Sequence, residues 1–308
     1  MQHWRSFSVR IDMYKVLFFG FVCIGLVEGV DAQLKRFYSL HDVDSYDTVD
    51  FSLDATSGIS FVRTVQGGNP LNIFGNPDLD KINPSFMSQV KNNTCKVELK
   101  LDEFKSSGLG NGLVFAMFGD TEEEESNYWK MLLNDNKIYH LDLTFGIGSS
   151  DVDLSGAAVR NLRIKTGSAD VKIGYEKARY NLTDMDTFMI KVDLGSIEAA
   201  DLNLARARNI IADVGFGNAA LDFGDKSTQT CDVRASVGAG NLTVNIPREA
   251  PIIIRIKDSP LCGISIEDNF EQVERNVYVS PYYDARADNL LKFDIDVSLG
   301  NIDFVYVD

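Results

Sequence analysis

The sequence predicts an all-β protein, a single-chain parallel β-solenoid that is right-handed and β-helix-like, elongated, and has few or no helices. A pattern repeated six times between Phe145 and Tyr306 predicts this fold: apolar residues alternate, a glycine followed by Ser or Asn intervenes, and apolar residues alternate again. The first five glycines lie 19, 28, 22 and 23 residues apart, which is about one solenoid coil each. No segment longer than two turns shows helical periodicity. The repeat glycines, predicted to be structural corners, are Gly148, Gly167, Gly195, Gly217, Gly240 and Gly300.

The phase of the alternation predicts the shape of each coil. Apolar residues occupy odd offsets before a repeat glycine, as Leu143 and Phe145 do, and even offsets after it, as Val152 does. Because successive side chains of a strand point to opposite faces, a straight strand would turn one of these sets outward. We therefore predict a bend at each repeat glycine, with a left-handed or otherwise β-forbidden backbone conformation at Gly217. The 60-residue step from Gly240 to Gly300 predicts an insertion.

The first 32 residues have the features of a targeting segment. Three basic residues precede the apolar run 16–27, which is too short for a stable membrane anchor. The segment 30–32, which ends with the small residue Ala32, resembles the cleavage site of a signal peptide. We predict a signal peptide over 1–32 and a mature chain that starts at Gln33. Initiation at Met13 would leave a shorter signal of the same design. The expected location is exported: the periplasm, the outer surface or the medium.

The remaining residues show no linker, so we predict continuous coils with two regions, N-terminal β coils over 33–119 and the main solenoid over 120–308. Residues 120–136 interrupt the pattern with an acidic run and are expected to form a solvated loop. Two cysteines, Cys95 and Cys231, continue inward alternations. A bridge between Cys231 and Cys262 is the favoured pairing in an oxidising compartment, and the sequence leaves open whether it forms.

Charge excludes some classes of partner. The chain carries 30 Lys and Arg against 45 Asp and Glu, for a net charge of −15. Nucleic acids and anionic membranes require clustered Lys and Arg, so neither is an expected partner. Cations and basic ligands remain compatible with this charge.

Local chemistry offers one candidate site and no catalytic centre. Asp151, Asp170 and Glu198 each lie three residues after a repeat glycine on the outward phase, so stacking about 4.8 Å apart would align them in a column. Such a column is either a solvated row with displaced side chains or a site for a hard cation such as Ca²⁺. No other cofactor is expected. Because His41 and His140 lie far apart in the sequence and no nucleophile motif occurs, no catalytic residue is assigned.

Three runs of the sequence carry a family resemblance: Tyr-Trp-Lys-Met-Leu-Leu-Asn at 128–134, Leu-Asp-Leu-Thr-Phe-Gly-Ile-Gly-Ser-Ser-Asp-Val-Asp-Leu-Ser-Gly at 141–156, and Asn-Leu-Arg-Ile-Lys-Thr-Gly-Ser-Ala-Asp-Val-Lys-Ile at 161–173. These runs resemble the bacterial toast-rack domain family, whose coils carry a tryptophan strand and which comprises the cell-wall-active antibiotic response proteins and related adhesin-like proteins. The resemblance covers about 120–308 and extends over 46–119 by pattern alone. It implies a β-solenoid and a role in envelope stress signalling or adhesion. This chain lacks the transmembrane helices of the signalling members.

The sequence therefore predicts a non-catalytic, exported bacterial cell-envelope or secreted interaction module that resembles adhesins. Its expected partner is a protein or polysaccharide of the envelope or surface, and no transmembrane segment is expected in the mature chain. The alternative is a polysaccharide lyase or hydrolase built on a β-helix, which would use Ca²⁺ and a basic residue on one face of the solenoid. Only the analogy of fold supports that alternative.

Overall fold

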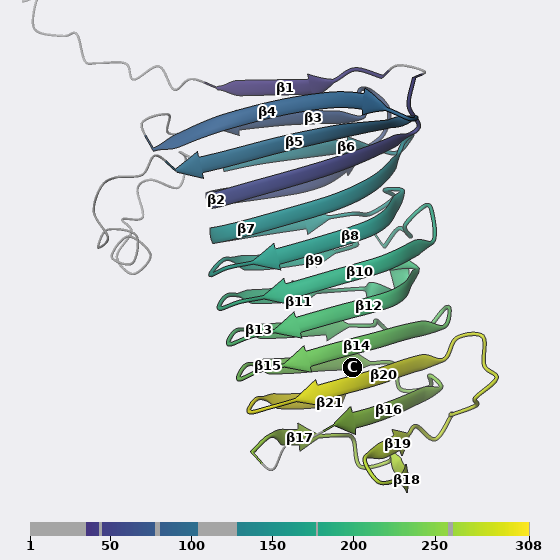
Figure 1. Ribbon diagram of the computed structural model, residues 1–308. Helices are drawn as coiled ribbons and strands as arrows, with labels where there is room; N and C mark the ends of the chain where they lie inside the picture. The colour runs from purple at the N-terminus through teal and green to yellow at the C-terminus, as the bar shows by residue number, and fades with distance from the viewer. Residues whose placement is uncertain are drawn as a thin grey trace, which may run out of the picture. The chain divides into compact units, whose positions relative to one another are not determined.

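Strands make up almost all of the regular structure in the computed structural model, which describes residues 35–42, 45–77, 81–103, 128–176, 178–257 and 261–307. These residues form 21 strands and one short 3₁₀ helix, η1 (Leu202–Ala205), within the unit Leu34–Asp308 (Figure 1). Most of the strands pair in parallel ladders, which confirms the predicted β-solenoid. The predicted signal peptide over 1–32 lies outside the described residues.

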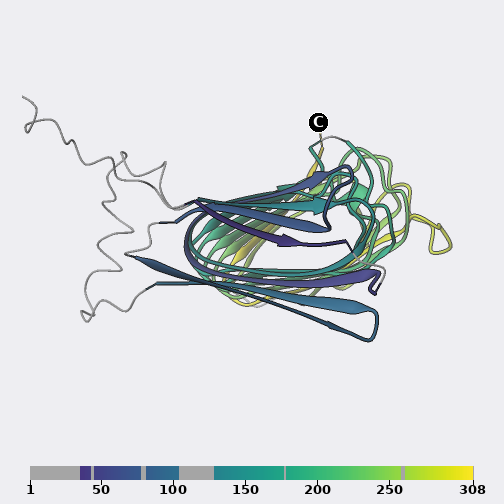
Figure 2. The ribbon, with the colours of Figure 1, turned by 90° about the horizontal axis from the view of Figure 1, so that it is seen from above.

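Each coil consists of one strand in a front sheet and one in a rear sheet, joined by a tight bend (Figures 1 and 2). The long strand β7 (Ile138–Asp153) passes through this bend and contributes to both sheets. The front sheet continues in parallel through β8 (Val159–Thr166), β10 (Met185–Val192), β12 (Ala207–Val214), β14 (Cys231–Val237), β20 (Leu291–Val297) and β16 (Ile252–Lys257). The rear sheet continues through β9 (Asp170–Gly174), β11 (Ser196–Ala199), β13 (Asn218–Asp222), β15 (Asn241–Ile246), β21 (Asn301–Tyr306) and β17 (Gly263–Ser265).

The predicted insertion between Gly240 and Gly300 changes the order of the coils. The last coil in the sequence, β20 with β21, pairs directly with β14 and β15 on one side. On its other side it pairs with β16 and β17, which precede it in the chain. The C-terminal coil therefore lies between two coils that are consecutive in the sequence, and the inserted segment forms the end of the stack.

Antiparallel strands pair at both ends of the stack, which the prediction of a purely parallel solenoid did not include. Parallel ladders need a crossover between strands, whereas a short turn can add an antiparallel strand, so hairpins readily cover the terminal coils. At the first end β4 pairs with β5, and β3 pairs with both β6 and β1. At the other end β19 pairs with β16 and β18. These end strands and their parallel partner β2 are β1 (Arg36–Leu40), β2 (Thr48–Val65), β3 (Leu71–Asn76), β4 (Ile82–Lys91), β5 (Thr94–Glu103), β6 (Tyr128–Asn134), β18 (Glu271–Glu274) and β19 (Val277–Val279).

The core between the two sheets is built from rows of apolar side chains that are in register across successive coils. Alternation places every second residue inward, and the parallel register stacks each inward residue on its counterpart in the next coil. Phe293 packs edge-to-face with Phe223 at 5.4 Å and with Phe304 at 5.2 Å between ring centroids, which joins the two sheets. One buried front row comprises Phe51, Leu141, Leu162, Phe188, Ile210, Val233, Phe293 and Ile254.

The repeat glycines lie at the bends, but the predicted reason for them is wrong at most positions. Among the six, only Gly148 has a positive φ, of 115°. At Gly217 a Cβ would overlap the carbonyl oxygen of Gly195 and lie 2.5 Å from Cγ1 of Val192. The same carbonyl contact from the neighbouring coil recurs at Gly195, Gly240 and Gly300. Close stacking of backbones, and not an unusual φ, therefore requires glycine at these corners.

The second coil departs from the predicted alignment of the glycines. Gly167 stacks on Gly146, with its N–H donating to the carbonyl oxygen of Phe145 at 2.8 Å. Asp170 pairs with Ser149 and Ser196, each of which directly follows a corner glycine. The corner position of this coil is therefore held by Ala169, which precedes Asp170, and not by Gly167. The true register of this coil is therefore shifted by two residues from the one predicted.

The strands determine the burial of the cysteines and the conformation of part of the predicted loop 120–136. Cys95 and Cys231 are buried free thiols, so the bridge between Cys231 and Cys262 is not formed. Burial raises the pKa of the Cys231 thiol to about 12, which keeps it protonated and unreactive at neutral pH. Within the predicted loop 120–136, residues Tyr128–Asn134 instead form strand β6, because Trp129 and its alternate neighbours face the core.

Candidate functional site

The predicted carboxylate column is interrupted by Lys172. The ladder pairs Asp151 with Lys172, and Lys172 with Glu198, so these three residues share one row. Asp170 lies in a different row, between Ser149 and Ser196, because of the two-residue shift in this coil. The structure thus corrects the sequence alignment that placed Asp151, Asp170 and Glu198 together.

Each of these carboxylates has a protein partner. Asp151 accepts hydrogen bonds from Arg63, at 2.5 Å from Nη2 and 3.0 Å from Nη1. Glu198 lies 4.0 Å from the Nζ atom of Lys172, and the hydroxyl of Ser196 donates to Asp170 at 2.5 Å. Among the described residues, no group of three or more His, Cys, Asp or Glu side chains is arranged to hold a metal ion.

The outer face of the front sheet carries rows of charged side chains, because the outward positions of its strands hold Asp, Lys and Arg. Arg163 lies 3.4 Å from Asp142 on the neighbouring strand, and Lys292 lies 3.1 Å from Asp232. Exposed pairs of this kind contribute about 0–1 kcal/mol each to stability. Their main effect is to present charges of both signs in register across successive strands.

A cavity of about 670 Å³ opens on this outer face, across β12, β14, β20 and β16, and the turn that joins β18 to β19 borders it. Its volume lies within the range typical of ligand sites. The cavity is a local exception in an acidic protein, since four cationic side chains line it. We call it the basic groove, and its cations are Arg234, Arg255, Lys257 and Arg275.

Two of the four cations in the basic groove are paired with carboxylates. Arg255 lies 3.6 Å from Asp294 on the adjacent strand. Lys257 donates to Asp296 at 2.8 Å, and this hydrogen bond raises the pKa of Lys257. All four side chains are partly exposed, so the pairs leave room for a ligand to compete.

The other two cations, Arg234 and Arg275, have no ion pair or hydrogen bond to any residue that the structure describes. Arg234 is the register partner of both Ile211 and Asp294, which places it in the middle of the groove floor. Arg275 lies on the turn at the border of the groove. The site therefore holds two guanidinium groups that can bind an incoming anion.

A second outer surface is apolar and lies along the bends. The residue before each corner glycine was predicted to face inward, but Leu194, Phe216 and Leu299 are 64, 73 and 58% exposed. The bend extends over three residues, so the alternation reverses before the glycine and the central side chain points outward. Ile147, at the equivalent position of β7, is 41% exposed.

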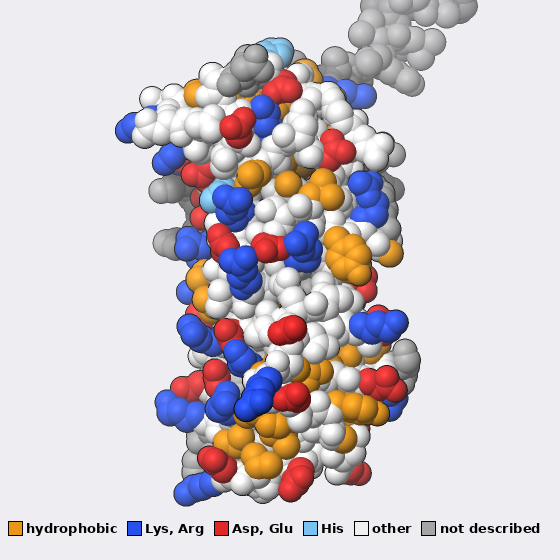
Figure 3. Space-filling view, turned by 90° about the vertical axis from the view of Figure 1, so that its right-hand side faces the viewer, with side chains coloured by type: hydrophobic (Ala, Val, Ile, Leu, Met, Phe, Trp, Pro, Cys, Tyr) orange, Lys and Arg blue, Asp and Glu red, His pale blue; other side chains and the backbone are white. Residues whose placement is uncertain are grey.

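The opposite edge, where the chain passes from a rear strand to the next front strand, is mixed in character. Lys and Arg lie beside Asp and Glu on it, with hydrophobic side chains between them (Figure 3). Asp184 pairs there with Arg206 and, at 2.9 Å, with Arg208. Tyr180 and Leu182, in the loop before β10, are about half exposed.

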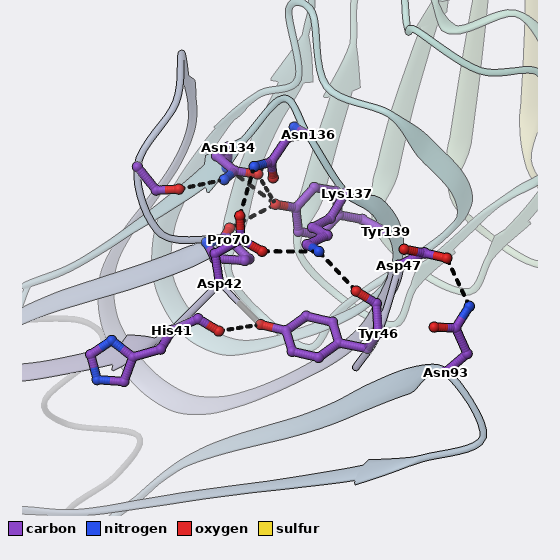
Figure 4. Close-up of polar contacts among 11 residues, drawn as sticks. His41, Asp42, Tyr46, Asp47, Pro70, Asn93, Asn134, Asn136, Lys137 and Tyr139 are labelled. Carbon is purple, nitrogen blue, oxygen red and sulfur yellow. Dashed lines mark hydrogen bonds and ion pairs between the residues drawn. The ribbon is translucent and has the colours of Figure 1, made fainter. Parts of the chain in front are cut away.

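A polar network joins three turns at the first end of the stack (Figure 4). Lys137 lies 2.9 Å from Asp42, donates to the carbonyl oxygen of Tyr46 at 2.8 Å and lies over the Tyr46 ring at 4.8 Å. The Tyr46 hydroxyl donates to the carbonyl oxygen of His41 at 2.5 Å. All of these groups bond to one another, so the network is structural and fixes the entry of the chain into β2.

The buried phenol of Tyr139 belongs to the same network and gives a test of it. Its hydroxyl donates to the carbonyl oxygen of Pro70 at 2.6 Å and accepts from the backbone N–H of Asn134 at 3.1 Å. Tyr139→Phe would remove both of these hydrogen bonds, but the Asn134 N–H would still donate to the carbonyl oxygen of Pro70 at 3.1 Å. We therefore expect the free energy of unfolding to fall by about 1 kcal/mol. Urea denaturation measures this change. Tyr278→Phe, at a partly buried tyrosine outside the network, serves as the control, and an equal effect of both substitutions would contradict the expectation.

The same burial predicts a loss of stability at alkaline pH. Burial, with the nearby Cys95 and Asp42, raises the pKa of Tyr46 to about 12, and burial also raises the pKa of Tyr139. Below pH 10 both phenols are neutral in the folded and unfolded states, so their contribution is fully present. Above pH 10 the unfolded phenols ionise first, and stability falls through pH 12 by up to about 1.4 kcal/mol per pH unit for each tyrosine. In urea titrations from pH 8 to 11.5, Tyr46→Phe should reduce this slope, and an unchanged slope would contradict the assignment.

One family model and several solved structures are similar to this chain. Residues 64–188 match the family model of the N-terminal domain of toast_rack, DUF2154. No curated protein matches the sequence of this chain. A solved structure from Clostridium sporogenes ATCC 15579, described as a "putative cell adhesion protein", is 14% identical with a TM-score of 0.46, and the match covers 89% of this chain and 99% of that one. A "putative lipid binding protein" from Parabacteroides distasonis ATCC 8503 is 12% identical with a TM-score of 0.34, over 89% of this chain and 96% of that one.

The family match includes the tryptophan strand β6, the bend of β7 and the coil formed by β8 and β9, which are the segments whose sequence resembled toast-rack domains. Among the described residues no helix has the length and apolar character to cross a membrane. The match confirms, over the residues it covers, the resemblance that the sequence predicted: residues 64–188 are similar to the N-terminal domain of toast_rack.

Proposed function

We propose that this protein is an exported, non-catalytic interaction module that acts in the manner of an adhesin at the bacterial cell envelope or surface. Its partner is a polysaccharide or protein of the envelope. The toast-rack domain supports an envelope role, and the basic, apolar and small-residue segments of 1–32 support export. The net charge of −15 disfavours nucleic acid as the partner.

The observation that supports binding most strongly is the outer face of the front sheet. Its outward side chains are held in register by parallel ladders, so charged groups recur at the strand spacing of about 4.8 Å on a rigid surface. Extended surfaces of this kind are how stacked-repeat proteins contact long ligands. The basic groove is the part of this face where unpaired cations and a cavity coincide.

The carboxylates of the groove support a binding role over a catalytic one. Asp294 lies 3.6 Å from Arg255 and Asp296 lies 2.8 Å from Lys257, so both carboxylates are already engaged in ion pairs with cations of the groove. Histidine offers no alternative base in the groove, since His140 lies on β7 and its ring contacts Asn161 at 3.1 Å.

Retention of the purified protein on envelope fractions tests this function. Insoluble cell wall, extracted surface polysaccharide and solubilised envelope proteins would each be immobilised, and an unrelated protein of similar negative charge would serve as the control. We expect retention on at least one fraction at micromolar protein concentration, above that of the control. Retention on none of the three would refute the proposal.

A further inference from the structure

We infer that the basic groove binds a sugar chain that bears carboxylate groups, such as a uronate oligosaccharide. This inference rests on the proposed function, because it names the ligand of one surface of the interaction module. Three features of the groove support it. The groove has cations without protein partners, and it has carboxylates that can accept hydrogen bonds from sugar hydroxyls. Its backbone N–H and C=O groups are already hydrogen-bonded within the sheet.

The guanidinium groups of the basic groove select a carboxylate. Arg234 and Arg255 flank Asp294 on three adjacent strands, in one row of the ladder. Two strand spacings separate their backbones, about 9–10 Å, which is comparable with the length of a disaccharide. A guanidinium presents parallel N–H donors that match both oxygens of a carboxylate. Arg275, at the border, supplies a third guanidinium to the same groove.

The acidic side chains of the groove favour a sugar over a plain polyanion. The next row places Asp213, Ser236, Asp296 and Lys257 on the same four strands. Carboxylates would repel a densely charged polyanion, but they accept hydrogen bonds from the hydroxyls of a sugar ring. Ser236 and the partly exposed Ile211 add a hydroxyl and an apolar contact to the groove floor.

The position of the groove disfavours an extended acidic peptide. Extended peptides gain affinity by pairing with the exposed backbone edge of a sheet. The floor strands β14 and β20 are central, with ladder partners on both sides, so their backbone groups are not available. A ligand on this floor must bind through side chains alone.

Isothermal titration calorimetry with the purified protein tests the inference. The probes are tetragalacturonate, the neutral tetrasaccharide obtained by reducing its carboxyl groups, and tetraglutamate. We expect binding of tetragalacturonate, with the other two bound at least about tenfold more weakly, because each lacks either the carboxylates or the hydroxyls.

The variant Arg234→Ala/Arg275→Ala should weaken tetragalacturonate binding at least about tenfold. Arg163→Ala, on the same face but outside the groove, should change it less than about twofold, because Arg163 already pairs with Asp142. All three substituted side chains are exposed, so unchanged melting temperatures are expected to show that the variants fold.

No binding of tetragalacturonate, equal binding of tetraglutamate, or equal loss in both variants would overturn the inference. These results are distinguishable from failure of the proposed function. A protein that is retained on envelope fractions but does not bind tetragalacturonate refutes only the ligand assignment. A protein that does neither refutes both proposals.

Discussion

Gly217→Val is expected to lower the free energy of unfolding by about 3 kcal/mol or more, which corresponds to a fall of roughly 6–12 °C in melting temperature for a domain of this size. Any Cβ at Gly217 overlaps the carbonyl oxygen of Gly195 in the neighbouring coil, and the methyl groups of valine add a conflict with Val192. Relief requires two coils to separate, which weakens the ladders on both sides of the bend. Thermal unfolding followed by circular dichroism measures the change.

Gly68→Val provides the matched control. Gly68 has a φ of 83°, but no atom lies within 4 Å of a Cβ placed there. Its valine would therefore suffer the backbone strain of a left-handed residue, about 1–2 kcal/mol, without a steric conflict. If Gly217→Val were no more destabilising than Gly68→Val, close stacking at the corners would not be the reason for glycine.

Trp129→Ala should have the second large effect, a loss of about 3–5 kcal/mol in the free energy of unfolding. Trp129 is the largest of the fully buried side chains, and its ring lies against Gly75, where a Cβ would be 2.5 Å from the ring. Removal of the ring leaves a cavity between β3 and β6 that the paired backbones cannot close. Circular dichroism in urea is the suitable measurement, because the other tryptophan, Trp4, lies in the predicted signal peptide.

Trp129→Phe separates the loss of volume from the loss of the indole N–H. The Nε1 atom of Trp129 is buried without a hydrogen-bond partner among the described residues. Phenylalanine keeps an aromatic ring and deletes that unpaired donor, so we expect less than half the effect of alanine. Equal losses in the two variants would contradict the account that the volume of the aromatic ring stabilises this region.

The core of the coils could be predicted from the sequence because its signal is local. Residues such as Leu162 and Ile164, or Ile295 and Val297, alternate with polar residues, and strand geometry alone then assigns the faces. The register of the second coil could not be predicted in this way. Gly167-Ser168 has the same local pattern as the true corners, and only its hydrogen bonds to the previous coil, including Ser168 N–H to Gly146 at 2.7 Å, reveal the shift.

The alternation around Trp129 predicts a strand, but the acidic run before it led to the prediction of a loop. The alternation of Trp129, Met131 and Leu133 is that of a half-buried strand, and all three are fully buried. The acidic run that precedes them favoured a loop over the whole segment 120–136. The family resemblance contained the better evidence, since it included a tryptophan strand at this place.

The basic groove had no signal in the sequence because its cations come together through long-range pairing. Arg234 and Arg255 lie on β14 and β16, and the strand between them, β20, comes from near the end of the chain. Alternation predicts that Arg234 points outward, but nothing local predicts the order β14–β20–β16. The turn that carries Arg275 belongs to the same insertion, whose existence the 60-residue step predicted and whose position it did not.

The most direct test of the central claim, that this protein binds an envelope polymer without cleaving it, is size-exclusion chromatography with light scattering on a mixture of the purified protein and polymers extracted from bacterial envelopes. This measurement reports both association and polymer mass. The account predicts that the protein elutes with the polymer and that the polymer mass stays unchanged after prolonged incubation. Separate elution of protein and polymer would contradict binding, and a falling polymer mass would instead support a lyase or hydrolase.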